Sequence, residues 1–125
     1  MARTAFELEY VVRSSIPILY KFLTTPSGLA QWFADEVDIN EGVYSFNWEG
    51  SSEEAELLDE EEDEFVRYRW MESDDDEYFE FKIGRSEVTG DTILYITDFE
   101  DERFVEDQER FWDSQIKQLR QQIGG

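Results

Sequence analysis

Residues 104–123, FVEDQERFWDSQIKQLRQQI, decide how this chain folds, because they have the spacing of a long amphipathic helix. Apolar side chains recur there three, four and seven positions apart, which places them on one helix face. They are Phe104, Phe111, Trp112, Ile116, Leu119 and Ile123. Gly124 and Gly125 follow and do not continue a helix well, so the helix is predicted to end at residue 123. A stripe of this length must be buried against another layer of structure.

The residues before this helix predict that layer, because their apolar and polar side chains alternate. In residues 6–13, FELEYVVR, the even-numbered positions are apolar, which is typical of a half-buried antiparallel strand. Similar patterns predict seven strands, over residues 6–13, 37–39, 43–48, 55–58, 65–71, 79–83 and 93–98. Short turns join the later strands, so we expect a meander.

Two short helices are predicted between the first two strands. Ser14-Ser15 offers a cap for a helix over residues 15–23, and Pro17 fits in its first turn. Thr25 and Pro26 repeat the pattern before a helix over residues 26–33. The order is one strand, two helices, six strands and one long helix, so we predict an α+β fold and a single domain over residues 1–125. The long helix should lie on the concave face of a curved, seven-stranded antiparallel sheet.

The composition excludes several kinds of chemistry. The 125 residues include 32 Asp or Glu but 11 Lys or Arg, which gives a formal net charge of −21, and the chain has neither Cys nor His. The usual zinc, haem and iron–sulfur sites need thiolate or imidazole ligands and are not expected. Triads built on His and Cys nucleophiles are excluded. We therefore predict no metal, no cofactor and no disulfide.

Charge and hydropathy also indicate partners and location. A strongly acidic chain repels phosphate, so nucleic acid and anionic membranes are poor partners. No apolar run approaches the ~20 residues that span a bilayer, and the stretch after Arg3 lacks the apolar core of a signal peptide. We therefore expect a cytoplasmic protein, and the sequence leaves its oligomeric state open.

The candidate site is the set of side chains expected to point inward between the sheet and the long helix. Most are aromatic, and Tyr and Trp combine flat apolar area with a polar tip, as ligand pockets require. The candidate ligand-binding residues are Tyr10, Tyr44, Phe46, Trp48, Tyr68, Trp70, Phe79, Phe81, Leu94, Ile96, Gln108, Trp112 and Gln115, and Phe6 and Leu8 share their inward face. The alternative is that these residues form a packed core. The two glutamines either contact a ligand or reach solvent from the helix shoulder, because a buried amide without partners is costly.

Charged residues suggest other functions. Arg67 and Arg69 could bind an anionic head group, or could pair across strands with carboxylates such as Glu56 and Glu80. Asp98 ends an apolar strand and is the carboxylate to consider for acid–base chemistry, which needs a buried group with a raised pKa.

Two acidic clusters, residues 59–64 and 74–77, are predicted to be solvated turn tips that keep the protein soluble and prevent edge pairing. Neither contains the glycine of a calcium-binding loop. The alternatives are a basic protein partner or adaptation to a salty habitat, since Lys is scarce.

Several segments together resemble a known family. They are Ile18-Leu19-Tyr20-Lys21-Phe22-Leu23-Thr24-Thr25-Pro26, Leu29-Ala30-Gln31-Trp32-Phe33, Tyr44-x-Phe46-x-Trp48-x-Gly50, the strand with Trp70, and the final helix with Phe111-Trp112, Ile116 and Leu119. The chain resembles the START-like superfamily, also called the helix-grip or SRPBCC fold, from residue 6 to residue 123. Within it, the chain looks most like homologues of the activator of the large heat-shock chaperone's ATPase.

The resemblance implies a helix-grip fold with a cavity between the long helix and the sheet, which in relatives holds a lipid, a sterol-like molecule or a polyketide. The leading hypothesis is a non-enzymatic domain that binds an apolar or amphipathic small molecule there. The second is an acidic, co-chaperone-like protein-interaction module. The third is a cyclase- or hydrolase-like enzyme that uses Asp98 or a pocket tyrosine.

Overall fold

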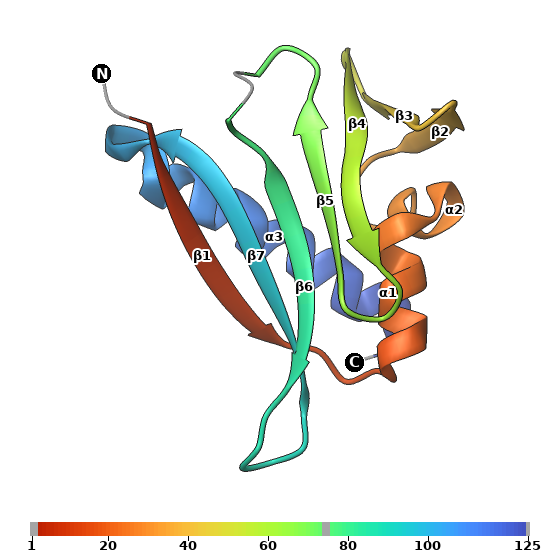
Figure 1. Cartoon of the computed structure of the whole chain (residues 1–125), viewed down its shortest axis with the longest axis vertical. Coiled ribbons are helices and arrows are strands. Elements are labelled where there is room, and N and C mark those ends of the chain that lie inside the picture. The colour runs from red at the N-terminus through yellow and green to blue at the C-terminus, as the bar shows by residue number, and fades with distance from the viewer. Residues whose placement is uncertain (1–2, 74–75, 125) are drawn as a thin grey trace.

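Seven strands form one antiparallel sheet in the computed structural model, which describes residues 3–73 and 76–124 (Figure 1). The strands are β1 (Arg3–Val11), β2 (Glu36–Asn40), β3 (Val43–Trp48), β4 (Ser51–Glu61), β5 (Phe65–Trp70), β6 (Phe79–Arg85) and β7 (Thr92–Asp101). Their order across the sheet is β1-β7-β6-β5-β4-β3-β2. Strands β2 to β7 therefore form the predicted meander, and β1 pairs with β7 at one edge.

The helices connect the edges of the sheet and cover one of its faces. α1 (Ile16–Thr24) and α2 (Pro26–Leu29) lead from β1 to β2, which lie at opposite edges. A 3-10 turn, η1 (Glu102–Phe104), leads from β7 into α3 (Val105–Ile123), which runs diagonally across one face toward α1 (Figure 1). This arrangement confirms the predicted α+β helix-grip fold. No helix within the described ranges is long and apolar enough to cross a bilayer.

Capping residues fix the two short helices as predicted. Ser15 Oγ accepts a hydrogen bond from the Ile18 N–H at 3.4 Å. Thr25 Oγ1 accepts from the Gly28 N–H at 3.0 Å and donates to the Lys21 carbonyl at 2.8 Å. Thr25 therefore ends α1 and begins α2.

α2 ends earlier than predicted, at Leu29 instead of residue 33. The N–H groups of Trp32, Phe33 and Ala34 all donate to the Leu29 carbonyl, at 3.3, 2.8 and 3.3 Å. This convergence replaces the regular helical ladder with an irregular turn, which carries Trp32 and Phe33 into the core.

The first acidic cluster is solvated as predicted, with five of its six carboxylates exposed and Asp63 half-buried, but only part of it forms a turn. β4 continues to Glu61, so half of the first cluster lies on a strand and the turn is limited to residues 62–64. A β-bulge, where the pairing with β5 shifts between Leu57 and Asp59, lets the ladder continue into this acidic stretch. In the second cluster, residues 74–75 lie outside the described residues. Glu77 is buried, and its Oε2 accepts a hydrogen bond from Arg3 Nε at 2.7 Å.

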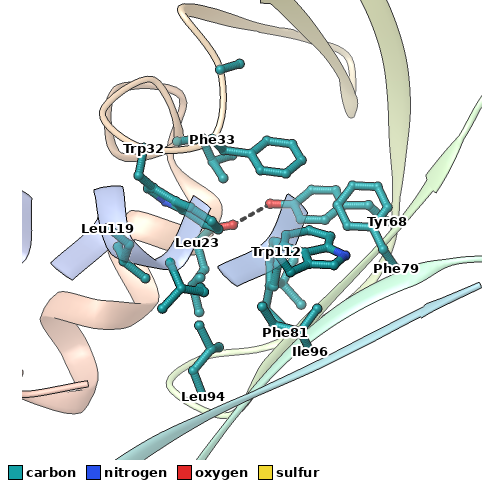
Figure 2. Close-up of a cluster of buried hydrophobic side chains, with 14 of the residues drawn as sticks. Leu23, Trp32, Phe33, Tyr68, Phe79, Phe81, Leu94, Ile96, Trp112 and Leu119 are labelled. Atoms are coloured by element: carbon teal, nitrogen blue, oxygen red, sulfur yellow. Dashed lines mark hydrogen bonds between the residues drawn. The ribbon is translucent and has the colours of Figure 1, made fainter. Parts of the chain in front are cut away.

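The core lies between α3 and the inward face of the sheet (Figure 2). Trp112 of α3 packs there near Phe81 and Ile96 of the sheet, and all three are buried. Leu119, further along α3, is buried on the side of Trp32 and Leu23. Further fully buried side chains come from the strands, from α1 and α2, and from the turn after α2; among the largest are Tyr68, Phe33, Phe46, Phe79, Leu19, Leu23 and Leu29.

Aromatic donors hold the carboxyl end of α1 against this core. The Tyr68 hydroxyl donates to the Leu23 carbonyl at 2.7 Å, as Figure 2 shows, and the Tyr44 hydroxyl donates to the Thr24 carbonyl at 2.7 Å. The last carbonyls of a helix have no partner within the helix, so these bonds let α1 end inside the protein.

Candidate functional site

A pocket of about 280 Å³ lies between the first half of α3 and the inward face of the sheet, and we call it the α3 pocket. Its walls are mainly aromatic. Phe33 comes from the turn after α2, Trp48 and Trp70 end β3 and β5, and Phe111 and Trp112 come from α3. Trp48 and Trp70 continue the inward faces of their strands beyond the part of the core that is fully covered.

Hydrogen bonds hold two of these indoles in place. Trp48 Nε1 donates to the Phe33 carbonyl at 2.8 Å, and Trp112 Nε1 donates to Asp98 Oδ2 at 2.9 Å. The rings of Trp48 and Trp70 lie with their centroids 6.2 Å apart. Because two of the N–H groups are engaged within the protein, these indoles present apolar ring surface to the pocket.

Asp98 is the buried polar group of the α3 pocket, with 8% of its surface exposed. Its Oδ2 accepts hydrogen bonds from Trp112 Nε1 at 2.9 Å and from Gln108 Nε2 at 3.1 Å, and its Oδ1 accepts from the Phe99 N–H at 2.8 Å. Burial raises the pKa of the Asp98 carboxyl above its ordinary value, and these three hydrogen bonds oppose that shift.

The alternation of β7 places Asp98 in the pocket. Leu94, Ile96 and Asp98 follow one another at intervals of two and are all buried, so the carboxylate continues the inward face where the apolar core ends. The sequence marked Asp98 for this reason, and the structure brings it to the pocket.

Ser51 and Glu53 complete the polar lining and were missed from the sequence. Both lie on β4, directly opposite Trp48 and Phe46 of β3. Residues in direct register point to the same face of a sheet, so Glu53 projects inward although it is exposed. The predicted strand began at residue 55. Continuing its alternation back from Leu57 would have identified both residues.

The structure brings some of the predicted site residues to the α3 pocket and places others in the core. Those that line the pocket are Trp48, Trp70, Gln108 and Trp112. Those buried in the core are Tyr44, Phe46, Tyr68, Phe79, Phe81, Leu94 and Ile96. Phe6 and Leu8 are partly buried against that core.

The remaining two predicted residues lie away from the α3 pocket. The Tyr10 hydroxyl donates to Asp113 Oδ1 at 2.6 Å. Burial and this hydrogen bond both raise the pKa of Tyr10. Gln115 Nε2 donates to the Phe33 carbonyl at 2.9 Å and lines a more polar, open depression of about 410 Å³ beside residues 30–35.

Phe33 limits the depth of the α3 pocket. Its ring centroid lies 5.1 Å from that of Phe46, 6.0 Å from that of Phe79 and 5.8 Å from that of Trp112. The ring therefore fills the space between α3 and the sheet below the pocket. The sequence predicted Phe33 on the apolar stripe of a helix, and nothing in that pattern indicated how far the turn after α2 would insert it.

The two strand arginines pair with carboxylates, as predicted for the outer face. Arg67 Nη2 lies 2.6 Å from Glu80 Oε2, and Arg69 forms an ion pair with Glu56. Both pairs join neighbouring strands. Within residues 3–73 and 76–124, no three Asp or Glu side chains are grouped so that they could hold a metal ion.

Comparison with known proteins identifies the family. Residues 1–125 match the family model of a START-like superfamily domain. A protein from Bacteroides fragilis, solved by NMR, is 33% identical, with 98% of this chain and 92% of that chain covered and a TM-score of 0.69. No curated protein matches the chain.

More distant structures share the fold. The solution structure of the Aha1 dimer from Colwellia psychrerythraea has a TM-score of 0.80 at 15% identity, with 96% of each chain covered. DynU16, a protein in the dynemicin biosynthetic locus, has a TM-score of 0.78 at 15% identity, with 94% of this chain and 46% of that chain covered.

Proposed function

We propose that this chain, which belongs to the START-like superfamily, binds an apolar or amphipathic small molecule in the α3 pocket without catalysing its conversion. The observation that carries the proposal is the aromatic lining of a pocket between α3 and the sheet. Aromatic side chains supply most of the lining and a few polar groups complete it, which is the usual composition of a small-molecule site.

The size of the pocket restricts the ligand. A volume of about 280 Å³ is at the lower end of the range for small-molecule sites, which starts at roughly 300 Å³. Phe111 at the rim is 39% exposed. We therefore propose a small ligand, or a longer one that inserts only its end and covers Phe111 with the rest.

Native mass spectrometry of the purified protein, with a thermal-shift screen across a lipid panel, tests this proposal. Ser51→Trp would fill the pocket with a side chain from its own wall. Ser52→Trp is the matched control, because Ser52 is the next residue on β4 and lines a depression other than the α3 pocket. We expect a bound mass or a thermal shift in the native protein and in Ser52→Trp, and neither in Ser51→Trp. Absence of both signals from the native protein would contradict the proposal.

Asp98 favours a second candidate function, acid–base chemistry on the bound molecule. The carboxyl is buried, its pKa is raised and it lines the pocket, and these are properties of a general acid. Incubating a ligand identified by the screen with native protein and with Asp98→Asn separates the two candidates. A product that forms only with the native protein would favour the enzyme, whereas unchanged ligand with both proteins would favour binding alone.

A further inference from the structure

We infer that the ligand of the α3 pocket is an organic cation, an ammonium group attached to an apolar body. This inference deepens the proposed function and rests on it. Three features carry it: the rings of the partly exposed Trp48 and Trp70, two carboxylates that line the same pocket, and the lack of Lys and Arg among the described residues of its lining.

The tryptophans provide the surface that an ammonium group prefers. The face of an aromatic ring is electron-rich, and indole attracts cations more strongly than the rings of Tyr or Phe. Trp48 uses its N–H group for the bond to the Phe33 carbonyl and is only partly buried, so its ring surface remains available to a ligand, whereas Trp112 is buried and holds Asp98 in place. Trp70 adds a third indole beside Trp48.

Asp98 provides a negative charge that the protein balances only at longer range, through Arg3. Its three hydrogen-bond donors are an indole, an amide side chain and a backbone N–H, all of them neutral. Among the ion pairs between described residues, none includes Asp98. Buried charges in proteins are normally paired, so a cationic ligand would supply the missing partner. Glu53 adds a second carboxylate to the pocket lining.

None of the Lys or Arg side chains among the described residues lines the α3 pocket. Arg3 lines an adjoining depression of about 150 Å³ that also contains Asp98 and Gln108. Its guanidinium is engaged by Glu77 at 2.7 Å and Glu100 at 3.3 Å. The formal net charge of −21 also raises the concentration of cations near the surface.

An NMR titration with two probes of equal shape tests the inference. The probes are benzyltrimethylammonium and neopentylbenzene, which differ in having nitrogen or carbon at one position. Both are added from the same small fraction of dimethyl sulfoxide at physiological ionic strength, where exposed charges are largely screened. We expect shifts of the Trp48 and Trp112 indole signals, with the cation binding about tenfold more tightly than the neutral probe.

Four variants test which residues are responsible for the tighter binding of the cation. Asp98→Asn should weaken binding of the cation about tenfold and that of the neutral probe less than about twofold. Glu53→Gln should act in the same direction, and because Glu53 is exposed it tests the charge even if Asp98→Asn folds poorly. Glu9→Gln, on the exposed side of β1, removes the same charge elsewhere and should leave binding unchanged. Ser51→Trp should abolish it.

The results separate this inference from the proposed function. If both probes bind with equal affinity and Ser51→Trp blocks both, the pocket binds apolar molecules and the inference is wrong. If the cation binds equally well to Ser51→Trp, the attraction belongs to the acidic surface and the inference is again wrong. Binding of neither probe would also overturn the inference, and the proposed function would then depend on the mass-spectrometry result alone.

Discussion

The Tyr68 hydroxyl shows how a single polar atom determines where an element lies. Tyr68 is fully buried on β5, and its hydroxyl donates to the Leu23 carbonyl of α1 at 2.7 Å. Burial raises the pKa of Tyr68, so the hydroxyl stays a donor throughout the ordinary pH range.

We expect Tyr68→Phe to lower the free energy of unfolding by about 1–3 kcal/mol, because the Leu23 carbonyl would remain buried without its partner. Tyr95→Phe is the control, since Tyr95 is only half-buried and packs over Gly84 of β6. Urea unfolding followed by circular dichroism measures both variants. Equal stability losses in the two variants would show that the hydrogen bond from Tyr68 to the Leu23 carbonyl does not stabilise the fold.

Asp98 should make stability depend on pH. Its pKa is raised above the ordinary 3.8 in the folded protein. Between the two values the folded state binds more protons than the unfolded state, so the stability contributed by Asp98 falls as the pH rises through that window. Asp98→Asn has no carboxyl at this position, so its stability lacks this pH-dependent contribution. The free energy of unfolding of the native protein, minus that of Asp98→Asn, should therefore decrease from acidic to neutral pH. An increase, measured by urea unfolding at several pH values, would mean that the pKa is lowered.

At the scale of elements, the junction of α1 and α2 depends on a close approach of two backbone segments. A Cβ atom placed on Gly28 would lie 2.4 Å from the Lys21 carbonyl oxygen and 2.7 Å from the Phe22 Cα. Both are backbone atoms, so neither can yield without moving α1. The close contact keeps the turn after α2, and with it Phe33, in place.

Gly28→Ala should therefore destabilise the protein by about 1–3 kcal/mol through overpacking, although alanine is otherwise better by about 1 kcal/mol in a helix. Ser27→Ala is the matched control, because Ser27 is the exposed neighbour in the same helix. Thermal unfolding of both variants measures the effect. A Gly28→Ala protein as stable as Ser27→Ala would show that α1 and α2 can separate without penalty.

The elements themselves could be predicted from the sequence because most are fixed by local patterns. The alternation of Tyr44, Phe46 and Trp48, or of Leu94, Ile96 and Asp98, specifies a strand and its inward face whatever surrounds it. The helix caps at Ser15 and Thr25 likewise need only their neighbours.

The site could be predicted only in part, because it depends on how the elements meet. Four pocket residues were identified from inward-facing patterns, but Phe33 belongs to an irregular turn whose path follows from convergence of three N–H groups on Leu29. Glu53 was missed because an acidic side chain on an inward face contradicts the apolar pattern by which strands are recognised. Residues that break the pattern are those expected at functional sites.

At the scale of the whole molecule, like charges repel one another. The chain has a formal net charge of −21. Glu61, the last residue of β4, and Glu62, the first residue of the turn that follows, are two of the exposed carboxylates. Self-repulsion of this kind destabilises a compact state, and salt screens it.

We expect the midpoint of thermal unfolding to rise by several degrees as sodium chloride is increased from low to physiological concentration. A variant with Glu61→Lys and Glu62→Lys should respond less, because it carries less excess negative charge. Differential scanning calorimetry measures both slopes. A midpoint that falls with salt, or slopes that are equal, would contradict a dominant role for charge repulsion.

The position of Phe33 also has a consequence for how this protein interacts with light. All four tryptophans of the chain have ring centroids within 6.3 Å of the Phe33 centroid: Trp32, Trp48, Trp70 and Trp112. The tryptophan emission of the chain therefore comes from one small region around Phe33, which lines the α3 pocket, and a change in the wavelength or lifetime of that emission reports events there.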